Sequence, residues 1–345
     1  MPNASFARRS LLAAVACGAM LAAAAPAFAQ GVVNVYTNRE PGLYSATLDE
    51  FTKATGIKVN AIFSEQGLAE RIRAEGANSP ADVLITVDIG RLQEAVDLGI
   101  AQPVKSEELQ KNIPTQFRHP DGLWNALSLR ARAVYVSKER VTDKAVTYEG
   151  LADPKWKGKL CTRSFQHQYN IALVAAFVQK HGEAKTEEWL RGVKANLAKR
   201  PSGGDRDVAK DILAGVCDIG LGNQYYVGLM REGQNADQKK WAEAINVILP
   251  TFENGGTHIN VSGAVLAKNA PNRENAVKLL EFMTTPEAQR VFANVNYEYP
   301  VRPGIEVNKL VASFGDLKAD AMSVADIAKL RAKAAELVDK VGFDR

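Results

Sequence analysis

Residues 32–87 alternate between β-rich runs and amphipathic stretches. The order along the chain is strand 32–36, helix 43–55, strand 57–63, helix 68–75 and strand 81–87. Gly56, Gly76 and Gly99 each follow a helical stretch, where a helix end favours the left-handed conformation that glycine adopts at low cost. Strands separated by helices predict an α/β fold with a largely parallel sheet. Ligands of such sheets bind beyond the carboxyl ends of the strands, here the loops 37–42, 64–67 and 88–90.

A second α/β set follows the turn at 119–122. An extended run at 127–137 is long enough to pass between two domains, and 245–249 with 259–267 returns the chain, broken by Pro250 and Gly255-Gly256. Helical periodicity appears at 171–180, 187–197, 208–214, 274–284, 286–294 and 324–341. We therefore predict two lobes with a cleft between them. The predicted first lobe is 30–127 with 253–305, and the second is 128–252 with 306–345.

The first 29 residues have the composition of a cleavable signal peptide. Arg8-Arg9 precede an apolar run at 11–25, and Ala27-Phe28-Ala29 forms a small-residue cleavage site. The paired arginines also resemble a twin-arginine signal, so either that route or the Sec route leads out of the cytoplasm. Cys17 falls within the removed segment. No later stretch is long and apolar enough to span a bilayer, so we predict no direct membrane insertion.

Charge and cysteine content limit the partners of the mature chain. Cleavage leaves 316 residues, which is enough for two domains, with a formal charge of +2. That small excess argues against nucleic acid or an anionic membrane as the main partner. Cys161 and Cys217 remain. In an oxidising compartment they either form a disulfide or stay as two buried thiols, and their spacing does not distinguish the two.

The pair Tyr225-Tyr226 is the strongest indication of a ligand. Adjacent residues on a strand point to opposite faces, so both phenols reach one ion only where the backbone turns. Residues 217–222 predict a short strand that runs into a glycine-rich turn, with a helix opening at Tyr225. A bound multivalent cation keeps phenols ionised at neutral pH, and phenolate oxygen prefers hard ions such as Fe(III). The alternative is ordinary packing, with one Tyr under the turn and the other solvated.

Other residues indicate no catalysis. His119, His181 and His258 are isolated, and His167 lies two residues before Tyr169, near enough to support a ligand. The segment 202–205 precedes a helix and has two interpretations, an anion cradle or a helix cap. No order of Ser, His and Asp or of Cys and His can be assigned, and neither Gly-x-Ser-x-Gly nor His-Glu-x-x-His occurs. We predict that the chain is not an enzyme.

Five segments of the mature chain carry a family pattern. They are VNVYTNRE at 33–40, FTKATGIKV at 51–59, NSPADV at 78–83, LADPKWKG at 151–158 and VSG at 261–263. Over nearly its whole mature length the chain resembles the periplasmic ferric-iron-binding proteins, the substrate-binding components of bacterial iron(III) ABC transporters. The resemblance implies a type II periplasmic-binding-protein fold, a periplasmic location and delivery of iron to an inner-membrane ABC permease, with the protein acting as a monomer. Because these segments recur in binding proteins for other ligands, the ligand-specific signal is the set of tyrosines.

The resemblance also implies a ligand set. It places Tyr225 and Tyr226 on the paired iron-binding tyrosines and Tyr169 on a third, and it makes Arg130 similar to the basic residue that faces the iron or its anion. Members of that branch carry a His-Tyr pair after the first strand, where this chain has Glu40-Pro41.

We therefore expect three phenolates with an exogenous anion such as carbonate or bicarbonate, held by Arg39 or Arg130. Glu40 remains a fourth candidate, and Tyr44, three residues late and within a predicted helix, is a less suitable one. Two alternatives stay open at this point. The same fold could bind an organic anion, a phosphonate or a polyamine, or the cleft could belong to an exported enzyme.

Overall fold

A ten-stranded sheet runs through residues 31–345, the part of the chain that the computed structural model describes. The predicted signal peptide at 1–29 lies outside the described residues. Seven strands follow one another across the sheet in the order β2 (Lys58–Phe63), β1 (Val32–Thr37), β3 (Val83–Thr86), β9 (Ile259–Ala267), β5 (Asn125–Ser137), β7 (Ile219–Asn223) and β6 (Leu160–Cys161). Three more strands attach beside this path: β4 (Ala101–Gln102) on β9, and β8 (Ile245–Ile248) and β10 (Tyr299–Pro300) on β5.

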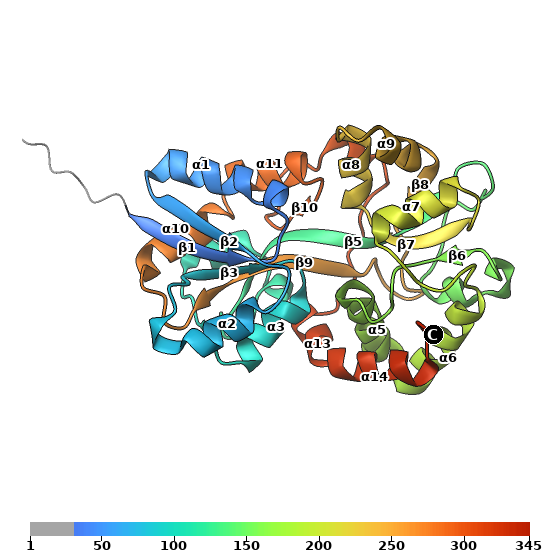
Figure 1. Ribbon diagram of the computed structural model, residues 1–345, viewed down its shortest axis with the longest axis horizontal. Coiled ribbons are helices and arrows are strands. Elements are labelled where there is room, and N and C mark those ends of the chain that lie inside the picture. The colour runs from blue at the N-terminus through green and yellow to red at the C-terminus, as the bar shows by residue number, and fades with distance from the viewer. Residues whose placement is uncertain (1–30) are drawn as a thin grey trace, which may run out of the picture. The chain divides into compact units, whose positions relative to one another are not determined.

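The first half of the fold matches the predicted strand and helix alternation. Strands β1, β2 and β3 are parallel, and β9 joins β3 in the antiparallel direction. The helices of this half are α1 (Ser45–Thr55), α2 (Leu68–Glu75), α3 (Ile89–Asp97), α4 (Glu107–Asn112), α10 (Arg273–Phe282) and α11 (Pro286–Val295). Helices α1 and α11 cover one side of the sheet, and α2 and α3 lie on the other (Figure 1). Gly56 and Gly76 end α1 and α2 with φ of 72° and 57°, a region that L side chains avoid.

Residues 134–252 form most of the second half, together with α14 (Arg331–Val341). Its other helices are α5 (Gln168–His181), α6 (Glu183–Ala195), α7 (Asp205–Leu213), α8 (Tyr225–Glu232) and α9 (Ala236–Glu243). Between the halves, α12 (Lys309–Ala312) and α13 (Val324–Lys329) bury most of their apolar residues on the side of the first half. Helices α7, α8 and α9 lie on one side of β7, and α5, α6 and α14 lie on the other (Figure 1). The predicted single helix at 324–341 is two helices that meet at Leu330. Five short 3-10 turns complete the described elements, at Pro41–Leu43, Gly76–Asn78, Thr115–Phe117, Glu149–Ala152 and Pro154–Trp156.

Two large hydrophobic cores flank the middle of the sheet. The first includes Phe51, Leu92 and Trp124, and the second includes Phe177 and Leu190. Strands β5 and β9 run from the first core toward the second, and Figure 1 shows both in the middle of the fold. The first part of β5 pairs with β9, and its last part pairs with β7 and β8. A change of pairing partner within one strand makes β5 the direct connection between the two cores. The exact lobe boundaries stay a prediction.

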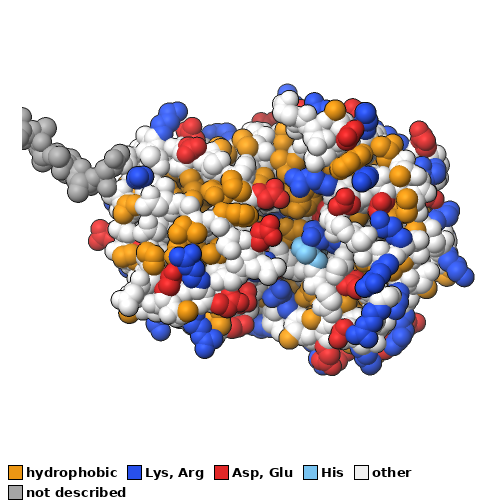
Figure 2. Space-filling model, in the orientation of Figure 1, with side chains coloured by type: hydrophobic (Ala, Val, Ile, Leu, Met, Phe, Trp, Pro, Cys, Tyr) orange, Lys and Arg blue, Asp and Glu red, His pale blue; other side chains and the backbone are white. Residues whose placement is uncertain are grey.

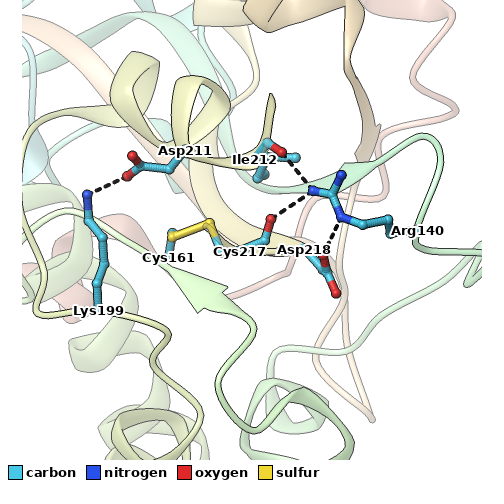
Figure 3. The surroundings of a disulfide bond; sticks show 7 residues. All are labelled: Arg140, Cys161, Lys199, Asp211, Ile212, Cys217 and Asp218. Carbon is cyan, nitrogen blue, oxygen red and sulfur yellow. Dashed lines mark hydrogen bonds and ion pairs between the residues drawn. A yellow bond between two sulfur atoms is a disulfide. The ribbon is translucent and has the colours of Figure 1, made fainter. Parts of the chain in front are cut away.

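A disulfide joins Cys161 at the end of β6 to Cys217 just before β7, with the two Cα atoms 5.8 Å apart (Figure 3). The sequence left open whether these cysteines form a disulfide or stay as two buried thiols, and the structure has the disulfide. Arg140 Nη2 donates to the carbonyl oxygens of Cys217 at 3.1 Å and of Ile212 at 2.7 Å, and Arg140 Nε donates to Asp218. These contacts fix the turn that leads into β7. Within residues 31–345 no helix is both long and apolar enough to cross a membrane.

Candidate metal site

The three predicted tyrosine ligands lie at the starts of two helices. Tyr169 is the second residue of α5, and His167 precedes the helix, with its ring Nδ1 accepting from the backbone N–H of Tyr169 at 3.2 Å. Tyr225 opens α8 directly after β7, as the glycine-rich turn predicted. In the first turn of a helix, neighbouring side chains point in directions about 100° apart rather than to opposite faces, so Tyr225 and Tyr226 can face one space.

All three tyrosines meet in one buried cluster. Tyr169, Tyr225 and Tyr226 are 6%, 2% and 9% exposed, and they pack together with Leu43 from the loop after β1. The rings of Tyr225 and Tyr226 have their centroids 4.2 Å apart. The three phenols line one pocket of about 270 Å³, and Glu40 lines the same pocket. The structure thus brings together four residues that the sequence separates by as many as 186 positions.

Two of the predicted ligand loops, 37–42 and 64–67, contribute to the opposite wall of this pocket, whereas the predicted loop 88–90 does not line it. Asn38 and Glu40 follow β1, Glu65 and Gln66 follow β2, and Val87 follows β3. The pocket therefore lies beyond the carboxyl ends of the parallel strands, where α/β sheets bind ligands. Near the middle of the face drawn in Figure 2, hydrophobic side chains are bordered by basic, acidic and histidine side chains, a composition that agrees with the residues lining the pocket.

Burial keeps the paired phenols protonated in the absence of a cation. It raises the pKa of Tyr225 well above its ordinary value of 10, and the neighbouring Tyr169 and Tyr226 raise it further. Burial raises the pKa of Tyr226 as well, and the neighbouring Tyr169 and Asp205 raise it further. Cationic side chains stand close by: the guanidinium of Arg163 is 5.2 Å from the Tyr169 ring centroid, and that of Arg206 is 4.6 Å from the Tyr226 ring centroid. A multivalent cation bound in the pocket would favour the ionised form of these phenols.

Arg39 and Arg130 meet behind the tyrosines, on a buried carboxylate that sequence reasoning missed. Arg39 Nη2 lies 2.9 Å from Glu298 Oε2, and Arg130 Nη2 lies 3.8 Å from Glu298 Oε1. Both arginines also donate to Ser262 Oγ. Burial alone would raise the pKa of Glu298, but the two guanidinium groups and a hydrogen bond from Ser128 hold that pKa below its ordinary value. The Arg130 guanidinium is 5.9 Å from the Tyr169 ring centroid and 5.7 Å from that of Tyr225.

Glu40, Pro41 and Tyr44 have three different surroundings. The Glu40 side chain is 59% exposed at the pocket rim, with its Oε1 3.9 Å from Arg206 Nη1. Pro41 opens the 3-10 turn that follows. Tyr44 lies between that turn and α1, and its side chain belongs to the first hydrophobic core rather than to the residues that line the pocket. Glu40 is therefore placed to approach an ion in this pocket, whereas Tyr44 is not.

The segment 202–205 acts as a helix start. Helix α7 begins at Asp205, and the backbone N–H of Gly204 donates to Asp207 at 2.8 Å. Asp207 rather than Asp205 therefore makes the capping contact. Asp205 is buried and ion-paired with Arg132 at 2.6 Å. Among residues 31–345 no group of three or more His, Cys, Asp and Glu side chains is arranged to hold a metal ion.

Arg163 and Arg206 are further residues near the pocket that sequence reasoning did not single out. Arg163 lies in the loop between β6 and α5, six residues before Tyr169, and Arg206 is the second residue of α7. Their proximity to the tyrosines depends on how α5, α7 and α8 pack together. A signal existed for Arg206, since it directly follows the glycine-rich segment that had been considered as an anion cradle.

Comparison with known proteins identifies the relatives of this fold. The family model for bacterial extracellular solute-binding proteins matches residues 78–322. Iron uptake protein A1 of Synechocystis is 44% identical over 316 residues, covering 91% of this chain and 88% of that protein.

Two solved structures are also similar over 91% of this chain and 100% of theirs. The Bordetella ferric binding protein is 56% identical with a TM-score of 0.85, and the Trichodesmium protein IdiA (FutA), solved in complex with iron and citrate ligands, is 42% identical with a TM-score of 0.86. These similarities confirm the predicted two-lobed α/β fold class and the predicted resemblance. The chain belongs to the family of bacterial extracellular solute-binding proteins, and its relatives include ferric iron-binding and iron uptake proteins.

Proposed function

We propose that this protein captures Fe(III) in the pocket lined by Tyr169, Tyr225 and Tyr226 and delivers it to an inner-membrane ABC permease. The observation that carries the proposal is the meeting of three buried phenols, from two separate segments, in one pocket. Phenolate oxygen is a hard donor, and Fe(III) is the hard ion that it suits best. The names of the relatives point to the same cargo. We place the protein in the periplasm, as a monomer without catalytic activity.

Three phenolates leave coordination positions for an exogenous anion, which we propose to be carbonate or bicarbonate. Arg163 and Arg206 stand over the tyrosine rings and supply positive charge next to those positions. An arginine fork can hold a carboxylate-like anion by two parallel hydrogen bonds. Citrate offers the same chemistry, and it accompanies iron in the Trichodesmium structure. Glu298 and Ser262 already bind Arg39 and Arg130. These two arginines would therefore support the anion and the phenolates from behind.

Capture would close the pocket between its two walls. The tyrosines come from the segments around α5 and α8, and Asn38, Glu40 and Gln66 come from the loops after β1 and β2. Iron held by the tyrosines alone would remain exposed to water on one side. A closed form that adds the opposite wall would bind iron more tightly, so iron binding would favour that form. Bending of β5 and β9 would bring the walls together. Small-angle scattering should then give a smaller radius of gyration with Fe(III) than without it.

One absorption spectrum tests the proposal. Purified protein titrated with Fe(III) should develop a broad visible band from tyrosinate-to-iron charge transfer, with one iron per chain by elemental analysis. A protein that stays colourless and iron-free would contradict it. The basic side chains around the pocket favour an organic anion or a phosphonate as the second candidate, and such a ligand would raise thermal stability without any visible band.

A further inference from the structure

Arg132 contacts both of the segments that carry the tyrosines. Its Nη2 and Nε donate to Asn170 Oδ1 at 2.7 and 3.0 Å, and Asn170 is the neighbour of Tyr169 in α5. Its Nη1 donates to Asn223 Oδ1 at 3.1 Å, and Asn223 is the last residue of β7, two positions before Tyr225. One buried guanidinium, 2% exposed, therefore connects the two helix starts at which the phenols lie.

Asp205 completes this connection from a third segment. Its Oδ2 accepts from Arg132 Nη1 at 2.6 Å and from the backbone N–H of Asn223 at 2.8 Å, and its side chain is fully buried. Burial alone would raise the pKa of Asp205, but Arg132 and Arg163 hold it below its ordinary value, so the carboxylate stays ionised. Asn170 is in turn held by the loop before α5, since its Nδ2 donates to Thr162 Oγ1 at 3.2 Å.

The backbone of Arg132 lies where β5 changes its pairing partner. Ala131 pairs with Ile259 of β9, and the next residue, Arg132, pairs with Asn223 of β7. The carbonyl oxygen of Arg132 also accepts from the hydroxyl of Tyr148 at 2.8 Å. The guanidinium therefore extends from the point where β5 passes from β9 to β7, and its planar fork fixes direction as well as distance.

We propose that Arg132 is a positioning residue for metal capture: its guanidinium sets the separation and orientation of the Tyr169 helix relative to the Tyr225-Tyr226 helix. This inference rests on the proposed function. Three phenolates bind one ion only if their oxygens converge on one point, and a small displacement of either helix start removes that convergence. Arg132 itself does not line the pocket, so it would act on the ion only through the two helices.

A purely stabilising role predicts something different. Exchanging a buried ion pair for apolar packing is often neutral, so stability alone does not require an arginine here. Lysine keeps the charge next to Asp205 but presents a point charge in place of the fork, so it cannot reach Asn170 and Asn223 together. The variant Arg132→Lys therefore separates positioning from charge pairing.

The matched control is Asn196→Ala. Asn196 is also a buried polar residue of the second half. Its side-chain amide donates to the carbonyl oxygens of Leu151 and Asp153, at 2.9 and 2.8 Å, rather than to the helices that carry the tyrosines. Three quantities are measured for both variants and the unmodified protein: the Fe(III) dissociation constant by chelator competition, the charge-transfer band, and the near-ultraviolet circular dichroism of the metal-free protein.

Arg132→Lys is expected to weaken Fe(III) binding about 10- to 100-fold, the range found when an outer partner of a metal ligand is lost. It should also shift the charge-transfer band and alter the tyrosine dichroism, whereas Asn196→Ala should lower thermal stability and leave the other quantities unchanged. An Arg132→Lys protein with the affinity and band of the unmodified chain would overturn the inference alone. An unmodified protein that binds no iron would overturn the proposed function and this inference with it.

A second pair of variants covers the case in which Arg132→Lys does not fold. Asn170→Ser and Asn223→Ser each remove one arm of the connection and keep Arg132 paired with Asp205. If Arg132 acts through both arms, the loss of affinity in the double variant should differ from the product of the two single losses. Two single variants that each bind Fe(III) as tightly as the unmodified protein would overturn the inference.

Discussion

Arg130 and Arg132 lie two residues apart on β5, and each is buried against a different carboxylate, Glu298 for Arg130 and Asp205 for Arg132. Residues at this spacing on a strand share a face, so both charges lie on the same side of β5. Arg39 shares Glu298 with Arg130, and Arg163 shares Asp205 with Arg132, so the surroundings of the phenols keep an excess of positive charge before a cation arrives. Exchange of three phenol protons for one Fe(III) would leave that net charge unchanged.

The first prediction concerns the phenols themselves. Tyr225→Phe and Tyr226→Phe remove only a hydroxyl group, so the fold should remain while Fe(III) affinity falls by at least about 100-fold, beyond most outer-partner losses. Chelator competition measures the affinity, and Tyr169→Phe should behave in the same way. Tyr44→Phe is the control, since Tyr44 packs in the first core and should leave the affinity unchanged. Unaltered affinity in all the pocket variants would return the tyrosines to a packing role.

The second prediction is proton release. Burial raises the pKa of Tyr225 and Tyr226 above 10, so these phenols are protonated at neutral pH. They must release their protons to the solvent when the metal binds. Iron loading should therefore release about three protons per ion after subtraction of a protein-free blank, and affinity should fall as pH falls. Titration in weakly buffered solution measures the release. Tyr226→Phe should release one proton fewer, and an equal count in both proteins would contradict phenolate binding.

The third prediction concerns the anion and Glu40. Titration with Fe(III) should give tighter binding with bicarbonate, or with citrate, than in their absence, because an anion completes the coordination beside Arg163 and Arg206. Glu40→Gln should change the affinity by less than about threefold, since Glu40 is exposed at the rim and any pairing with Arg206 is weak. The opposite result, anion-independent binding with a large loss in Glu40→Gln, would make Glu40 the ligand that completes the shell.

The fourth prediction is a loss of stability in acid caused by Glu298. Because its two arginine partners hold its pKa below 4.5 in the folded state, ionised Glu298 stabilises the fold above pH 4.5, and that contribution is lost as pH falls through the lower, folded-state pKa. Glu298→Gln should lower the free energy of unfolding at neutral pH by about 3–5 kcal/mol, since two buried guanidinium groups lose their partner. Urea unfolding between about pH 5 and pH 3 should show a flatter dependence in this variant than in the unmodified protein. Equal slopes would assign the acid sensitivity to other carboxylates.

Local pattern predicted most of the fold. Strands β1 and β2 and helices α1 and α2 lie within about two residues of the expected ranges. The β-rich and amphipathic segments alternate clearly, and α1 and α2 end at glycines with a positive φ that other residues rarely adopt. The helix start at Tyr225 followed from the same kind of signal. The break at Leu330 did not, since the hydrophobic periodicity continues through it while α13 packs against α3 and α5.

Contacts between distant segments could not be predicted from the sequence. Arg39 meets a carboxylate 259 positions away, and Arg132 meets one 73 positions away. Glu298 lies in no recognisable metal or anion motif, and the segment 202–205 gave no sign that Asp205 would meet an arginine. The burial of both carboxylates depends on how the halves of β5 pair. The resemblance supplied Tyr169 and Arg130, whereas only the structure revealed that Arg39 and Arg130 share Glu298.

The disulfide has a consequence for the geometry of the chain before it folds. Tyr169 comes eight residues after Cys161, and Tyr225 comes eight residues after Cys217. Once the thiols are oxidised, Tyr169 and Tyr225 lie at the ends of two chain segments of equal length, and both segments start from the same disulfide bond. In the reduced chain the same tyrosines are separated by a 56-residue span and its full loop-closure entropy. Oxidation thus shortens the search by which the ligands of one ion find each other.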